Sequence, residues 1–210
     1  MSPIERSNAL RVLGVAAHMA GELQEARGFM TQRIELAREL GDLALVGTES
    51  SNLSMVERQL GNLERAEQLA TESLQLEARR GDEWAIPYTV NGLAAIAVET
   101  GAFERAATLL AAAATLQERQ GNAWPPDEAP HFERSRGAVT ERLDRELLEQ
   151  AWSAGEHMSF AQAVRYALAP GHASHKRERP ADRLTVLEGQ PGPRRSRRSD
   201  PPSQPMPESS

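Results

Sequence analysis

The chain lacks cysteine and is poor in aromatic residues, and each of these shortages excludes certain kinds of site or core. Without cysteine it cannot hold a disulfide scaffold, a cysteine-ligated zinc or iron–sulfur site, or a thiol nucleophile. Aromatic residues make up only 4% of the 210 residues, so any core must be built from Leu, Ala, Val, Ile and Met. No run approaches the about 20 apolar residues that cross a bilayer. We therefore expect a cytoplasmic protein with no membrane partner.

Charge and proline are unevenly spread along the chain. The first 170 residues carry a net charge of −9, whereas residues 171–210 carry +3 and hold seven of the 13 prolines. The latter segment has few apolar residues, so it cannot bury enough surface to offset the entropy lost on ordering. We predict one domain over 1–170 and a disordered Pro/Arg-rich tail over 171–210. The acidic domain disfavours direct binding of nucleic acid.

The domain contains an internal repeat with a period of forty residues, visible without gaps in three copies. The repeated positions are Leu13, Leu53 and Leu93; Gly21, Gly61 and Gly101; Leu23, Leu63 and Phe103; Ala26, Ala66 and Ala106; Leu36, Leu76 and Leu116; and Gly41, Gly81 and Gly121. We therefore divide the domain into repeats over 1–40, 41–80 and 81–120, followed by a cap over 121–170.

Each copy is predicted to form two helices. Apolar residues recur at helical spacing before and after the central glycine, as in Leu53, Val56 and Leu60 of the second copy. The repeated glycines can adopt the left-handed conformation that ends a helix. The repeated alanines, which we call the Ala66 column (Ala26, Ala66 and Ala106), are small enough to let two helices cross closely. Ser2 and Glu5 match a capping box at the start of the first helix.

The cap is predicted to be helical as well. A helical stretch covers about 127–143, Asp144 is the expected N-cap of a helix over 145–154 that Gly155 ends, and Ser159 caps a last short helix. We expect these helices to cover the apolar face of the third repeat, as terminal units of helical stacks do. The three tryptophans, Trp84, Trp124 and Trp152, are predicted to pack in the core or between helices.

These columns resemble the tetratricopeptide repeat, with unusually long helices. The matching residues are Leu53, Gly61, Leu63, Ala66 and Leu74 in the second copy and Leu93, Gly101, Phe103, Ala106 and Leu109–Leu110 in the third. The resemblance implies an all-α, right-handed superhelical stack of helical hairpins. The forty-residue unit is similar to repeats of large bacterial, actinobacterial-type ATP-dependent transcriptional regulators of the LuxR and antibiotic-regulator type. The runs 105–113 and 142–155 are similar to the closing part of those proteins.

The chain departs from that regulator family in two ways. It contains no phosphate-binding G-x-x-x-x-G-K-[ST] sequence and no convincing helix-turn-helix after residue 170. The resemblance therefore implies the sensor portion of such a regulator, a non-catalytic module that binds a protein or peptide. We expect no cofactor and no metal. The partner would be a protein or peptide, a second copy, or a separate nucleotide-binding or DNA-binding domain.

The resemblance also implies binding residues, because the first helix of each tetratricopeptide repeat lines a concave groove. The groove positions carried over are Asn8, Arg11, Val15 and His18 in the first copy; Thr48, Ser51, Met55, Arg58 and Gln59 in the second; and Tyr88, Asn91 and Glu99 in the third. For any single residue, a solvated polar side chain is the simpler interpretation. For the groove as a whole, binding is the expectation.

Two alternatives of other classes stay open. The first helix carries the apolar residues Val12, Val15 and Met19 with no preceding repeat to cover them, so the array can serve as a structural oligomerisation element. The basic run Arg194–Arg198 can make the chain a DNA-associated regulator. An enzyme is not expected, because no nucleophile–base, metal or phosphate-loop pattern occurs and we expect no pocket of convergent ionisable groups. His172 and His175 lack a third ligand nearby.

Overall fold

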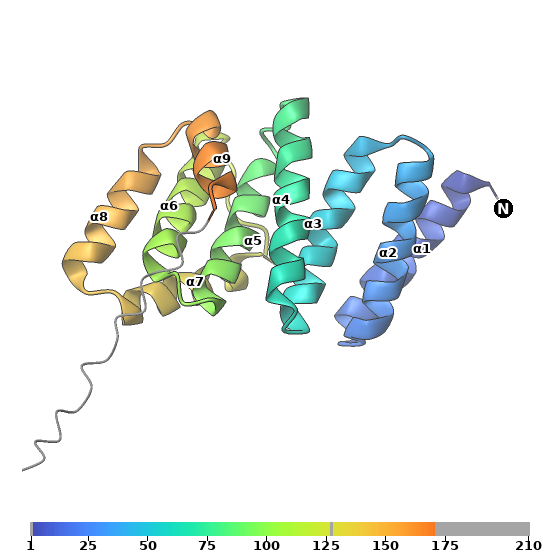
Figure 1. Cartoon of the computed structure of the whole chain (residues 1–210), viewed down its shortest axis with the longest axis horizontal. Helices are drawn as coiled ribbons and strands as arrows, with labels where there is room; N and C mark the ends of the chain where they lie inside the picture. The colour runs from blue at the N-terminus through green and yellow to red at the C-terminus, as the bar shows by residue number, and fades with distance from the viewer. Residues whose placement is uncertain (1, 127, 171–210) are drawn as a thin grey trace, which may run out of the picture. The chain divides into compact units, whose positions relative to one another are not determined.

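The computed structural model describes residues 2–126 and 128–170, and every regular element in these two ranges is an α-helix (Figure 1). The helices of this part are α1 (Pro3–Met19), α2 (Leu23–Glu39), α3 (Leu43–Gln59), α4 (Leu63–Arg80), α5 (Ile86–Glu99), α6 (Phe103–Arg119), α7 (Ala129–Arg142), α8 (Arg145–Glu156) and α9 (Phe160–Leu168). The all-α prediction is confirmed for these residues. The predicted disordered tail, with Arg194–Arg198, His172 and His175, lies outside them.

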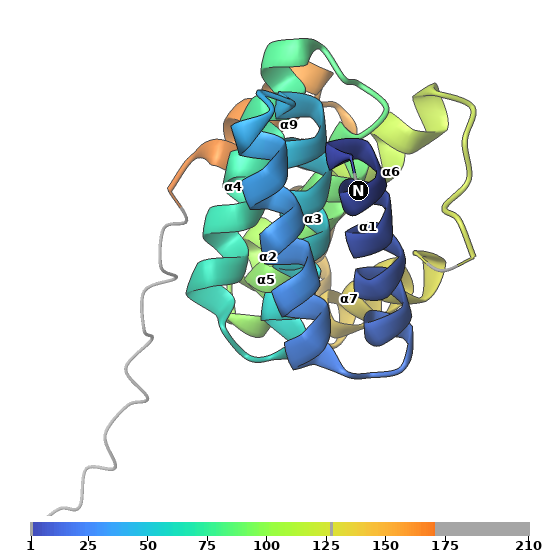
Figure 2. The ribbon, with the colours of Figure 1, turned by 90° about the vertical axis from the view of Figure 1, so that its right-hand side faces the viewer.

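The first six helices pack in chain order, each against the next. Figure 1 shows them side by side, and Figure 2 shows α1 and α2 joined at one end by a short turn. Three-residue connections such as Ala20–Glu22 reverse the chain, so consecutive helices run antiparallel. In the described residues, no helix combines the length and the apolar character that a membrane span requires.

The forty-residue period of the sequence recurs in the structure. The second helices of the three pairs begin at Leu23, Leu63 and Phe103. Contacts between first helices recur at the same interval. His18 Nε2 lies 3.2 Å from Gln59 Oε1, and at the next pair of equivalent positions Arg58 forms an ion pair with Glu99.

Local signals at the helix ends explain these boundaries. Ser2 Oγ accepts a hydrogen bond from Glu5 N while the Glu5 carboxylate accepts one from Ser2 N, which confirms the predicted capping box. Asp42 Oδ1 accepts from Leu45 N at 3.0 Å and so caps α3. Gly61, with φ of 81°, follows α3 in the left-handed region where a side chain is strained. The helices therefore end close to the repeated glycines, as the sequence predicts.

The core falls into two clusters of buried side chains. The N-terminal cluster comes from α1–α4 and comprises Ala17, Ala26, Met30, Ile34, Ala37, Val46, Leu53, Val56 and Leu69. The C-terminal cluster comes from α4–α7 and α9 and includes Ala66, Leu74, Val90, Leu93, Ala106, Leu109, Leu110, Leu116, Phe132, Val139, Ala163 and Ala167. The alanines of the Ala66 column are fully buried. Small side chains there let the helices approach closely.

The predicted cap packs on the end of the helix pairs, with α8 against α6 and α9 against α4, α5 and α6. Asp144 and Ser159 cap α8 and α9 as predicted. The prediction that Gly155 ends the preceding helix is wrong, because α8 continues to Glu156. Gly155 is instead buried against α6, where an added Cβ would clash with the Thr108 carbonyl oxygen and lie 2.8 Å from Ala111 Cβ. The glycine therefore permits close packing of α8 on α6.

Candidate functional site

A cavity of about 410 Å³ opens between α3 and α5. Its walls come from these two helices, from α4 and the turn that joins it to α5, and from the chain just before and at the start of α7. The lining residues are Thr48, Ser51, Asn52, Ser54, Met55, Arg58, Ala70, Glu77, Asp82, Trp84, Ala85, Tyr88, Thr89, Asn91, Gly92, Ala95, Pro125, Glu128 and His131. A volume of this size falls within the range of pockets that hold small ligands or parts of larger ones.

Part of the predicted groove lines this cavity. Thr48, Ser51, Met55 and Arg58 reach it from α3, and Tyr88 and Asn91 reach it from α5. The two helices are also joined across it, because Ser51 Oγ lies 3.4 Å from Thr89 Oγ1. Adjacent first helices thus bring polar side chains from different repeats to one place, although these residues lie about forty positions apart in the sequence.

The other predicted groove residues lie outside the cavity lining. Asn8, Arg11 and Val15 are exposed on α1, where His18 contacts Gln59 of α3. Glu99 is occupied by its ion pair with Arg58. The structure therefore concentrates the predicted site on the second and third repeats.

Aromatic rings stand in a row beside the cavity. The Trp84 and Tyr88 ring centroids are 5.2 Å apart, Tyr88 meets Trp124 edge-on at 5.6 Å, and Trp124 stacks on Phe132 at 5.2 Å. Trp124 and Trp152 pack against the C-terminal cluster as predicted. Trp84 does not, because 64% of its surface is exposed. The prediction for Trp84 is wrong, since the turn before α5 holds its ring at the cavity rim.

Glu77 is the most deeply placed ionisable group of the cavity, with 3% of its surface exposed. Its Oε1 accepts hydrogen bonds from the hydroxyls of Ser73 and Thr89, both at 2.8 Å, while its Oε2 has no hydrogen-bond partner. Burial raises the pKa of Glu77, the two hydroxyl bonds oppose this rise, and the nearby Asp82 carboxylate adds to it. A second acceptor without a donor is Oδ1 of Asn91, a residue with 4% of its surface exposed.

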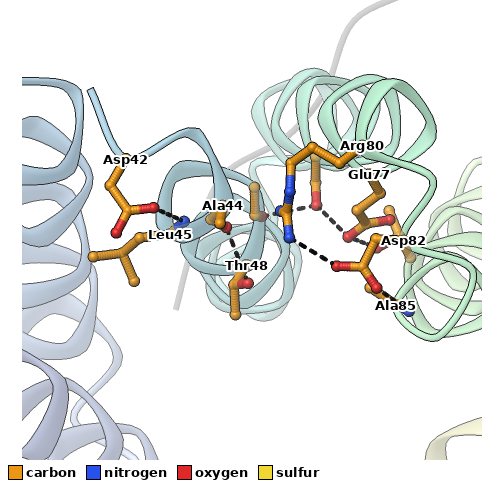
Figure 3. A network of polar contacts seen from close by, with 11 residues as sticks. Asp42, Ala44, Leu45, Thr48, Glu77, Arg80, Asp82 and Ala85 are labelled. Carbon is orange, nitrogen blue, oxygen red and sulfur yellow. Dashed lines mark hydrogen bonds and ion pairs between the residues drawn. The ribbon is translucent and has the colours of Figure 1, made fainter.

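Asp82 lines the cavity from the turn between α4 and α5, where its carboxylate makes two hydrogen bonds (Figure 3). One carboxylate oxygen accepts from Arg80 Nη2 at 3.1 Å, and the other accepts from the backbone N of Ala85 at 3.3 Å. These bonds hold the segment that carries Trp84 and precedes Tyr88. The turn is therefore held by hydrogen bonds to Asp82, which lines the same cavity as Glu77.

Sequence reasoning missed the acidic part of the site. Glu77, Asp82, Glu128 and His131 all line the cavity, so the expectation of no pocket with convergent ionisable groups is wrong. One signal was available for Glu77, because it continues the buried stripe of Leu69, Ser73 and Leu74 on α4. No spacing in the sequence links α4 to the chain before α7. In the described part of the chain, no cluster of three His, Asp or Glu side chains suits a metal ion.

Comparisons with protein-family models, with curated proteins and with solved structures find no match to this chain.

Proposed function

We propose that this chain is a non-catalytic binding module that holds a segment of a protein or peptide partner in the cavity between α3 and α5. The observation that carries the proposal is the convergence of Thr48, Ser51 and Arg58 with Tyr88 and Asn91 on one cavity. A lining that combines hydrogen-bonding groups with apolar and aromatic side chains suits recognition of a peptide, which presents backbone amides and side chains together.

We also propose that the helix pairs form a tetratricopeptide-like right-handed superhelix. Helix starts and interhelical contacts that recur every forty residues support it. In that setting the module would act in the cytoplasm as the sensor or regulatory part of a transcriptional regulator or signalling protein, and the peptide would belong to another domain or protein of the same system.

A second candidate function, self-association, is favoured by one specific observation. Large apolar side chains lie exposed on α1 and around the α2–α3 turn, namely Ile4, Val12, Leu13, Val15, Met19, Leu40 and Leu43. Apolar surface of this kind favours contact with another protein surface. Light scattering across a concentration series separates this candidate from the first, because a monomer at high micromolar concentration would contradict it.

Peptide binding is tested by filling the cavity without disturbing the fold. Gly92 lines the cavity in the middle of α5, and a Cβ added there meets no atom within 4 Å. Gly92→Met therefore places a flexible apolar side chain in open space while improving helix propensity. Gly28→Met is the matched control, because Gly28 is an exposed α2 residue that is equally open and is not part of the cavity lining.

The measurement is saturation-transfer NMR of the full chain with acetylated, amidated pentapeptides Ala-Ala-X-Ala-Ala, where X is each of the twenty residues. We expect at least one peptide to bind the unmodified chain and Gly28→Met with a millimolar or lower Kd, and to lose binding to Gly92→Met. Absence of binding by every peptide, or equal binding by Gly92→Met, would contradict the proposed function.

A further inference from the structure

We infer that the cavity between α3 and α5 selects a primary ammonium group on an apolar stem, supplied by the side chain of a lysine in the bound peptide. The inference rests on the proposed function and names the chemistry that the cavity recognises. It is carried by buried acceptors that lack donors, by the balance of charge in the lining and by the aromatic rim.

The cavity offers hydrogen-bond acceptors that the protein itself does not satisfy. Oε2 of Glu77 and Oδ1 of Asn91 are shielded from solvent and have no donor in the described structure. Such atoms are costly to bury alone, and an incoming donor recovers part of that cost. An ammonium group carries three N–H donors and no acceptor, so it complements this pair better than a carboxylate or a carbonyl does. Both oxygens are shielded, so the inference requires that these two side chains turn toward the guest when it binds.

The charges of the lining also favour a cation. Glu77, Asp82 and Glu128 line the cavity, against Arg58 and His131 on the basic side. The Arg58 guanidinium is neutralised by its ion pair with Glu99, and the Asp82 carboxylate is paired with Arg80 in the same way. An anionic guest would be repelled by the Glu77 carboxylate, whereas a cation would be attracted to it at this range.

The rim supplies contacts for a cation on a methylene stem. Trp84 is largely exposed beside Tyr88, and both rings line the cavity, where an ammonium group over a ring face gains a cation–π interaction. Met55, Ala85 and Ala95 provide apolar wall for the stem. A lysine side chain combines these two needs, since its four methylenes pack on apolar surface and its head pairs with a carboxylate.

The test compares probes that differ only in the group under study. Isothermal titration calorimetry of the full chain uses the acetylated, amidated pentapeptide Ala-Ala-Lys-Ala-Ala, its norleucine analogue, its glutamate analogue and free n-pentylamine. We expect the lysine peptide to bind at least tenfold more tightly than the norleucine and glutamate peptides. We expect pentylamine to bind more weakly than the lysine peptide, because it lacks the peptide backbone.

The matched variants are Glu77→Gln and Glu67→Gln, which remove the same charge from the same helix. Glu77 lines the cavity, whereas Glu67 is exposed on α4 and is not part of the lining. Glu77→Gln should abolish the preference for lysine over norleucine, and Glu67→Gln should keep it. If Glu77→Gln fails to fold, as judged by circular dichroism, the affinities of the lysine and norleucine peptides for the unmodified chain still show whether the cavity selects an ammonium group.

Failure of the inference differs from failure of the proposed function. If the norleucine or glutamate peptide binds as tightly as the lysine peptide and Gly92→Met abolishes that binding, the cavity binds peptides but does not select an ammonium group. If pentylamine binds as tightly as the lysine peptide, the peptide is overturned as the source of the ammonium. If no peptide of the twenty binds, the proposed function itself fails.

Discussion

The first and third repeats carry the same apolar pattern, yet the structure buries it to different extents. Leu13, Leu53 and Leu93 occupy equivalent positions, but 47% of Leu13 is exposed, against 2% of Leu53 and 4% of Leu93. The helices α7, α8 and α9 cover the third repeat, whereas no helix of the described residues covers the outer side of α1. Burial in a stack is therefore decided by what lies next to a repeat, and the repeat's own sequence does not fix it.

The two regions also differ in what holds them together. In the N-terminal region a buried ion pair between Arg33 of α2 and Glu49 of α3 stands beside the apolar side chains, and Arg33 Nε donates to Ser7 Oγ at 3.3 Å. In the C-terminal region α6 is packed by consecutive buried residues from Ala106 to Ala113. A buried ion pair is thus part of the packing in the region with less apolar cover.

The largest expected loss of stability comes from breaking the buried ion pair between Arg33 and Glu49. Glu49→Ala leaves the Arg33 guanidinium buried without its partner, which should lower the free energy of unfolding by about 3–5 kcal/mol. Glu72→Ala, which breaks the solvent-exposed pair with Arg38, should cost about 0–1 kcal/mol. Urea unfolding followed by circular dichroism measures both. Equal losses would show that burial does not distinguish the two pairs.

The next effect tests the comparison of equivalent leucines directly. Leu93→Ala should cost about 2–5 kcal/mol because it leaves a cavity in the C-terminal cluster. Leu13→Ala should cost about 1 kcal/mol or less, because its side chain is already half exposed. The same urea assay serves. A loss for Leu13→Ala as large as for Leu93→Ala would mean that α1 is covered in solution.

A smaller loss is expected where α8 crosses α6. Gly155→Ala should lower the free energy of unfolding by about 1–3 kcal/mol, because the new methyl group clashes with the α6 backbone at Thr108. Gly137→Ala on α7 is the control, since a Cβ there meets no atom within 4 Å. It should stabilise the helix by up to about 1 kcal/mol. A neutral Gly155→Ala would place α8 further from α6.

The smallest expected effect is a pH dependence of the free energy of unfolding, which arises from the buried Glu77 of the cavity. Burial raises the pKa of Glu77 above its ordinary value of 4.5, so over that interval the folded chain binds more protons than the unfolded chain. This contribution to stability is complete below pH 4.5 and is lost as the pH rises through the raised pKa. Glu77→Gln should flatten that decline in urea unfolding, and Glu67→Gln should not. An unchanged slope in Glu77→Gln would assign the decline to other groups.

The repeated helical hairpins could be predicted because the recurring glycine, alanine and leucine residues each meet a local structural requirement. A left-handed turn needs the glycine at Gly61, and a close helix crossing needs the small side chain of Ala66. Gly155 was misjudged because a glycine that ends a helix and one that admits a neighbouring helix look alike in a sequence. Resolving them needs the position of Thr108, which only the packed structure supplies.

The candidate site was predictable only where it follows the repeat. Ser51 and Asn91 occupy equivalent positions of successive first helices, so the period brings them together. Glu77 on α4 and Asp82 in the α4–α5 turn line the same cavity as Glu128 and His131, which come from the segment before α7 and from α7 itself, beyond the third repeat. The acidic half of the site therefore arises from long-range packing.

Residue-resolved NMR of the full chain, titrated with the pentapeptide Ala-Ala-Lys-Ala-Ala, tests most directly whether the α3–α5 cavity binds. We predict the largest amide shifts at Ser51, Tyr88 and Asn91, a shift of the Trp84 indole signal, and loss of all of these in Gly92→Met but not in Gly28→Met. Shifts that centre on the exposed apolar residues of α1, or that persist in Gly92→Met, would contradict the account.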